Sequence, residues 1–254
     1  MILAIDVGNT NIVLGCIEEG EIRDIVRIQT RAGETDAEYA IKLMQLLYIS
    51  GLDPKGFEGA ILSSVVPPVT GPMTQAVKRV TGLDCMVVGP GMKTGLNLRI
   101  DDPGTLAGDL LVGGVAALNC YGAPAIVMDL GTATTITVVD KDGVFRGGAI
   151  LPGVKLGVRA LAAGTSLLPE ISITPPQKAI STNTVDCMRS GAVFGNASMI
   201  DGLIDRMEEE LGMKCRVVAT GGLASSIVPF CRHEIELDDD LLLKGMWYLY
   251  EKNR

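Results

Sequence analysis

The spacing of hydrophobic and polar positions predicts short strands that alternate with helices. Apolar runs of strand length occupy residues 59–65, 84–88 and 216–219. The apolar positions recur at helical spacing in other segments, and these predict helices near residues 38–47, 73–80, 156–163 and 184–211, with a terminal helix from about Asp238. Such alternation is typical of α/β proteins that contain a sheet with parallel strands.

One pattern occurs twice along the chain. In Asp6 to Gly20 and again in Asp129 to Gly143, an Asp ends a short apolar strand and a Gly follows two positions later. Hydroxyl or amide residues come next, and an apolar run then leads to a second Gly, fourteen residues after the Asp. Each copy predicts a strand, a tight turn, a strand, a turn and a strand. The elements that follow each copy also match in order. We therefore predict a duplicated α/β lobe with a mixed sheet, divided into residues 1–119 and 120–254.

The nineteen residues between Asp109 and Asp129 carry no charge, which is nearly the length of a membrane span. Asn119, Gly122 and Pro124 interrupt them, so a buried helix, a turn and a buried strand are expected instead. The first six residues contain no basic residue and end in Asp6, which is not typical of a secretory signal. No membrane association is expected.

Composition excludes several other kinds of chemistry. His233 is the only histidine of the 254 residues, so a site with several histidine ligands cannot form, and its charged neighbours predict a surface position. The six cysteines include no Cys-x-x-Cys pair, and several lie in apolar runs, which favours free thiols in a reducing, cytoplasmic compartment. The net charge is -8 and there is no basic run, so nucleic acid is not expected as a partner.

The two Asp-Gly turns are the candidate functional elements. A turn of this kind exposes backbone N–H groups beside Asn or Thr side chains, and these groups can hold phosphate oxygens. A single copy could simply close a hairpin through an Asx turn. Two copies at matching positions favour a clamp around a polyphosphate, in which the turns face each other across a cleft and Asp6 and Asp129 hold metal ions.

Further short motifs accompany the two turns and spread over nearly the whole chain. With the turns, they are Asp6 to Asn11, Ser63 to Pro67, Gly89 to Gly91 with Thr94 and Gly95, Gly108 and Asp109, Asp129 to Thr132, Gly147 and Gly148 with Ile150, Pro152 and Gly153, and Ser190 and Gly191. Taken together and in this order, these motifs resemble those of the type III pantothenate kinases, in the superfamily of acetate and sugar kinases, heat-shock proteins and actin. This resemblance implies ribonuclease H-like lobes with mixed five-stranded sheets and an inter-lobe cleft.

The resemblance implies ATP-dependent phosphorylation of pantothenate to 4'-phosphopantothenate, the first step of coenzyme A biosynthesis, by a homodimer. It makes Asp109 the general base, although a pure helix N-cap is the alternative there. It assigns Mg²⁺ to Asp6 and K⁺ or NH₄⁺ to Asp129. The implied ATP contacts are Asp6, Val7, Gly8, Asn9, Thr10, Asn11, Ile12, Val13, Thr132, Gly221 and Gly222. The implied acceptor contacts are Ile100, Ala107, Gly108, Asp109, Leu110 and Thr184; an N-cap role is the alternative for Thr184.

Two positions depart from the family pattern, and both belong to the implied acceptor pocket. Leu110 replaces the arginine that usually follows the base, and Ile100 replaces a common tyrosine. Pantothenate is an anion and calls for a cation, which Lys93, Arg99 or a partner subunit could supply. Two alternatives therefore remain at this point. One is a kinase or phosphatase of the same superfamily that acts on another small molecule, and the other is a non-catalytic nucleotide-binding regulator.

Overall fold

The computed structural model describes residues 1–254, which form two compact units. Unit 1 contains Met1–Gly95, Asp101–Asn119 and Leu241–Arg254, and unit 2 contains Leu96–Ile100 and Cys120–Asp240. Both units are discontinuous in sequence, whereas each predicted lobe was a single continuous segment.

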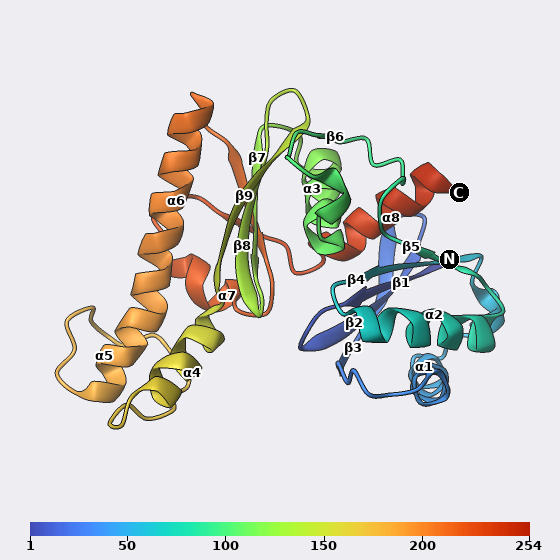
Figure 1. Cartoon of the computed structure of the whole chain (residues 1–254), viewed down its shortest axis with the longest axis horizontal. Helices are drawn as coiled ribbons and strands as arrows, with labels where there is room; N and C mark the ends of the chain where they lie inside the picture. The colour runs from blue at the N-terminus through green and yellow to red at the C-terminus, as the bar shows by residue number, and fades with distance from the viewer. The chain divides into compact units, whose positions relative to one another are not determined.

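Unit 1 is built on a five-stranded mixed sheet with the strand order β3-β2-β1-β4-β5 (Figure 1). β2 is antiparallel to both β1 and β3, whereas β4 pairs in parallel with β1 and β5 pairs in parallel with β4. The strands are β1 (Ile2–Val7), β2 (Asn11–Glu18), β3 (Glu21–Gln29), β4 (Gly59–Ser64) and β5 (Cys85–Val87).

Helices cover both faces of this sheet. On one face, α1 (Asp36–Ile49) and α2 (Pro67–Thr81) pack against Leu3, Ile5 and Val7 of β1 and form the core of the unit. On the other face, Leu243 of α8 (Leu241–Asn253) packs over Gly15, and Gly108 at the start of α3 (Gly108–Cys120) lies beside Ser63. Because successive side chains of a strand point to opposite faces, Asp6 lies on the α3 face of the sheet.

The sheet of unit 2 repeats the strand arrangement of unit 1. It has the strand order β11-β10-β7-β8-β9-β6, so that β9-β8-β7-β10-β11 matches the five strands of unit 1. The strands are β6 (Asn97–Leu98), β7 (Ala125–Leu130), β8 (Ala133–Val139), β9 (Val144–Pro152), β10 (Arg216–Thr220) and β11 (Glu236–Leu237). The predicted duplicated α/β lobe with a mixed sheet is confirmed. The sixth strand arises because Asn97 and Leu98 pair in parallel with Val144 and Phe145.

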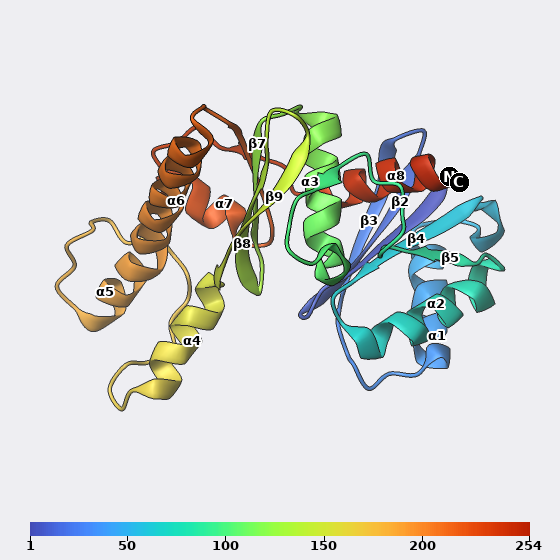
Figure 2. The ribbon, with the colours of Figure 1, turned by 45° about the horizontal axis from the view of Figure 1, so that its top comes forward.

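Four helical segments of unit 2 pack on one face of its sheet, as Figure 2 shows for α4, α6 and α7. They are α4 (Val154–Gly164), the π-helical turn Gly191–Gly195, α6 (Asn196–Leu211) and α7 (Ala224–Ile227). The short helix α5 (Thr184–Ser190) precedes the π-helical turn and adds no residue to this core. The helix predicted over residues 184–211 therefore contains a π-helical turn. Short 3₁₀ turns occur at Pro54–Gly56, Pro103–Thr105 and Val228–Phe230.

Two further predictions can be compared with the structure. The uncharged stretch after Asp109 forms α3, a turn and β7, as expected, and none of the helices is both long and apolar enough to cross a membrane. The terminal helix α8 begins at Leu241 and not at about Asp238 as predicted. Just before it, Glu236 and Leu237 pair with Val218 and Ala219 as an edge strand. The pairing satisfies backbone groups along the edge of β10, which a local helix pattern cannot reveal.

Candidate functional site

The first Asp-Gly turn joins β1 to β2 through the four residues 8–11. Val7 pairs with Ile12, and the Gly8 N–H donates to the Asn11 carbonyl oxygen at 3.0 Å. Thr30, just beyond β3, holds the turn from the side: its hydroxyl donates to the Gly8 carbonyl at 2.6 Å, and its N–H donates to the Thr10 carbonyl at 3.0 Å. Asn9 and Thr10 are left exposed at the tip. Thr30 was missed from sequence because its partners are 20 and 22 positions away.

The structure divides the implied ATP contacts of this segment into two kinds. The side chains of Val7 and Ile12 are fully buried among the core residues of unit 1. Only their backbone groups could therefore meet a phosphate. The polar side chains of Asn9 and Thr10 are exposed, and Asn11 is half-buried.

Asp6 is brought together with the start of α3 through Ser63. Asp6 and Ser63 are register partners in the parallel ladder of β1 and β4, close to the carboxyl ends of both strands. The Ser63 hydroxyl is buried without a hydrogen-bond partner, and a Cβ atom placed on Gly108 would lie 3.2 Å from it. Ligands of α/β proteins bind at the carboxyl ends of parallel strands. The two predicted residues Asp6 and Asp109 thus belong to the same end and the same face of the unit 1 sheet.

Asp109 is the second residue of α3, so it is not the residue that precedes and caps the helix. Its carboxylate accepts a hydrogen bond from the Leu110 N–H at 2.8 Å. Burial raises the pKa of Asp109, and hydrogen bonds from the N–H groups of Leu110 and of Asp109 itself offset part of that rise. A half-buried carboxylate with a raised pKa is a stronger base than an exposed one. Ala107 and Leu110 flank it at the start of the helix.

The second Asp-Gly turn is shorter than the first. Leu130 pairs with Thr134, which leaves the three residues 131–133 between β7 and β8, and the Gly131 N–H donates to the Ala133 carbonyl at 3.0 Å. Thr132 is exposed at its tip. The equal sequence spacing of the two copies concealed this difference, because the next turn is longer in the second copy: Glu18 pairs with Glu21, whereas Val139 pairs with Phe145.

Two glycines allow the backbone to close around this second turn. A Cβ atom on Gly221, whose φ is +95°, would lie 2.3 Å from Oδ1 of Asp129. A Cβ atom on Gly153 would lie 2.2 Å from the Thr132 carbonyl oxygen. Both positions therefore require glycine for packing within the protein. Gly222, in contrast, is exposed and faces open space, so a ligand could approach its backbone.

Thr184 lies at a cavity of about 920 Å³ within unit 2. The cavity lies among α4, α5, the π-helical turn, the start of α6 and the segment before α5. Its wall is largely apolar, and its polar members include Ser181, Thr182, Asn183, Thr184 and Asn196. The N-cap of α5 is Asn183, whose side chain accepts a hydrogen bond from the Asp186 N–H at 3.0 Å. Thr184 is the first residue of the helix, so the N-cap alternative for Thr184 is wrong.

The remaining residues that the family resemblance implies as acceptor contacts are distributed over both units. Ile100 belongs to unit 2, where its side chain lies near Gly147, while residues 107–110 belong to unit 1. Lys93 and Arg99, the candidate cations for an anionic acceptor, are both exposed. The sole histidine is far in sequence from all of these residues and pairs instead with Asp205, at 2.9 Å.

Two comparisons of the sequence with known proteins identify the same family. The family model described as type III pantothenate kinase matches residues 2–206. The type III pantothenate kinase of Moorella thermoacetica is 42% identical over 253 residues, with all of both chains covered.

Two solved structures share the fold at low sequence identity. One, from Campylobacter jejuni, is described as a conserved Baf family transcriptional activator; it is 16% identical, has a TM-score of 0.62, and the match covers 98% of this chain and 97% of that one. The other is a polyphosphate/ATP-glucomannokinase from Arthrobacter sp. strain KM, 14% identical, with a TM-score of 0.51 and coverage of 98% and 96%. The full-length sequence match and the family model together establish that this chain belongs to the type III pantothenate kinase family.

Proposed function

We propose that this protein transfers the γ-phosphoryl group of ATP to pantothenate and forms 4'-phosphopantothenate, the first step of coenzyme A biosynthesis. Family membership supports the reaction. The structural observation that carries it is the position of Asp109, a half-buried carboxylate with a raised pKa at the start of α3, on the same face of the sheet as Asp6.

In this proposal Asp109 orients the primary hydroxyl of pantothenate and accepts its proton. A carboxylate is a weak base for an alcohol, but phosphoryl transfer passes through a loose transition state and the proton leaves late. The raised pKa makes Asp109 better suited to this role than an exposed aspartate. The proposed acceptor contacts are Ile100, the residues 107–110 and Thr184.

ATP is assigned to the two Asp-Gly turns, with contacts from residues 6–13, Thr132, Gly221 and Gly222. Asp6 is assigned to Mg²⁺ and Asp129 to K⁺ or NH₄⁺. Carboxylate oxygens at the strand ends suit hard cations of this kind. When bound, these cations offset the negative charge of the phosphates.

We further propose a cytoplasmic homodimer. All six cysteines are free thiols, as suits a reducing compartment. Large apolar side chains are exposed in unit 2, at Ile150, Leu156, Leu161, Leu167 and Ile180, and a partner subunit would cover surface of this kind. Sedimentation that gave a monomer at every concentration would contradict the dimer.

The test is a direct assay of the purified protein with pantothenate, ATP, Mg²⁺ and K⁺, and with phosphopantothenate identified by mass spectrometry. Asp109→Asn should lose activity, while Asp101→Asn, at an exposed aspartate nearby, should keep it. An acceptor screen in the same assay addresses other small-molecule substrates. No turnover of pantothenate by the wild-type protein would overturn the proposal, and turnover of another acceptor alone would replace the substrate.

A further inference from the structure

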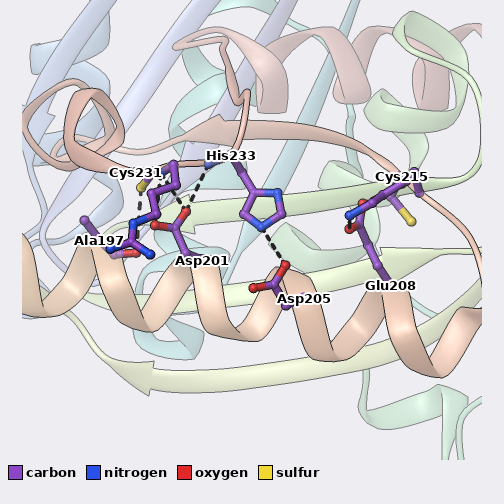
Figure 3. Close-up of polar contacts among 9 residues, drawn as sticks. Ala197, Asp201, Asp205, Glu208, Cys215, Cys231 and His233 are labelled. Atoms are coloured by element: carbon purple, nitrogen blue, oxygen red, sulfur yellow. Dashed lines mark hydrogen bonds and ion pairs between the residues drawn. The ribbon is translucent and has the colours of Figure 1, made fainter.

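Three potential metal ligands converge on one side of α6, and none of them is a residue assigned to the kinase reaction. Asp205 and Glu208 are three positions apart on the helix and therefore share one face. His233 reaches them from the segment after the 3₁₀ turn Val228–Phe230 (Figure 3). One ligand atom from each of the three side chains lies within 4.8 Å of the other two.

The backbone that carries His233 is fixed to α6. The buried side chain of Asp201 accepts hydrogen bonds from the Arg232 N–H at 2.9 Å and the His233 N–H at 3.2 Å (Figure 3). The imidazole then extends along the helix, with Nε2 2.9 Å from Oδ1 of Asp205. Ligands held in place before binding lose less entropy when a metal arrives.

Glu208 is an ionised carboxylate that already faces a cation. Burial acts to raise its pKa, but hydrogen bonds from Lys214 and from the Cys215 N–H outweigh this effect and lower the pKa. The Lys214 ammonium lies 2.6 Å from Oε2, and the Cys215 N–H lies 2.9 Å from Oε1. The Lys214 side chain is 81% exposed, so it can swing into solvent at little cost and leave Oε2 to a metal ion.

We propose that Asp205, Glu208 and His233 form a divalent metal site of the Zn²⁺ type that fastens the 231–235 segment to α6. One imidazole nitrogen with two carboxylate oxygens suits Zn²⁺ and Co²⁺, whereas Mg²⁺ and Ca²⁺ prefer oxygen ligands alone. Two carboxylates balance the charge of the ion once Lys214 has moved away. Three protein ligands leave the fourth position of a tetrahedral ion to water. The Cys215 N–H, bonded to Glu208, is the outer partner that orients this ligand.

The test uses the full-length protein after removal of metals by a chelator. Titration calorimetry with Zn²⁺ should give one site per chain, and Zn²⁺ should raise the melting temperature. Asp205→Asn and His233→Gln should weaken Zn²⁺ binding by about tenfold or more. The control Glu209→Gln changes an exposed neighbour on the same helix and should bind as the wild type does. Lys214→Met removes the competing ammonium and should strengthen binding.

Two further measurements keep the result specific. Exposed thiols at Cys120 and Cys187 could bind Zn²⁺ elsewhere, so Co²⁺ is used as a spectroscopic probe. A tetrahedral visible spectrum without sulfur-to-cobalt charge transfer supports the site, and a thiolate band would overturn it. Circular dichroism of the metal-free variants checks folding, and Asp205→Asn should keep full kinase activity. The proposal is also overturned if the wild type takes up no stoichiometric Zn²⁺, or if Asp205→Asn, His233→Gln and Lys214→Met bind it as the wild type does.

Discussion

A Cβ atom on Gly221 would lie 2.3 Å from Oδ1 of Asp129, so the turn after β10 is in direct backbone contact with the carboxylate assigned to the monovalent cation. The backbone of Gly221 also has a φ of +95°, which residues other than glycine rarely adopt. The positive φ and the close approach to Asp129 therefore both require glycine at position 221.

Gly221→Ala should lower the free energy of unfolding by about 2 kcal/mol or more, because it adds both backbone strain and a clash with Asp129. Urea denaturation measures the loss. Gly222→Ala is the matched control: a Cβ atom there meets nothing within 4 Å, and the change should be within about 0.5 kcal/mol of the wild type. Equal effects of the two substitutions would contradict this account.

The adjacent serines at the end of β4 should respond oppositely to removal of their hydroxyls. Ser63 is buried with no hydrogen-bond partner, whereas the Ser64 hydroxyl accepts from Thr70 at 2.8 Å and from the Val66 N–H at 3.2 Å. Ser63→Ala should be neutral or stabilising, and Ser64→Ala should cost about 1 kcal/mol. Urea denaturation of both variants in parallel checks the difference. A clear loss of stability in Ser63→Ala would show that its hydroxyl is paired.

The pH dependence of catalysis should reflect Asp109. Its pKa lies above the ordinary value of an aspartate, and the base works only when ionised. The specificity constant kcat/KM for pantothenate should therefore fall on the acid side at a pH higher than that of an ordinary exposed carboxylate. A pH–rate profile, corrected for the titration of ATP and checked for protein stability, measures this limb. If kcat/KM fell only at the pH of an ordinary exposed carboxylate, Asp109 would be excluded as the group that causes the fall.

Asp109→Asn should lower the kinase activity and raise the stability of the protein at neutral pH. The folded protein binds the Asp109 proton more tightly than the unfolded chain does, so stability from this group is present at acid pH and is lost as pH rises through its folded-state pKa. The neutral Asn avoids that loss, and the variant should melt at a higher temperature at pH 7, by a margin that shrinks towards acid pH. Activity should fall by about 10²–10⁴-fold. Calorimetry at several pH values, with Asp101→Asn as the control, checks the sign.

Leu110→Arg should improve use of the anionic acceptor. Leu110 follows the proposed base and is only half-buried, so the helix can accommodate the longer side chain. An arginine there would pair with the pantothenate carboxylate, which should lower KM for pantothenate by about tenfold with little change in kcat. Leu110→Met keeps a similar apolar volume and should leave KM unchanged. If KM did not change in Leu110→Arg, the pantothenate carboxylate would not bind beside position 110.

Much of the fold was visible in the sequence because the deciding patterns are local. The period of the apolar residues predicted the main strands and helices, and the repeated Asp-Gly pattern predicted two lobes of the same kind. The exceptions depend on distant partners. β6 and β11 consist of two residues each and exist only because Val144 and Val218 lie beside them. Segments as short as these carry no periodic signal.

The candidate site divides in the same way. The sequence by itself predicted which acids and turns belong to the phosphate chemistry, since residue type and order along the chain carry that prediction. Only the tertiary structure decided that Asp6 and Asp109 share one face of a sheet, that Thr30 holds the first turn, and that the only histidine joins Asp205 and Glu208 on α6. These relationships depend on the sheet face to which each side chain points and on which distant segments pack together. Neither is set by the neighbouring residues in the sequence.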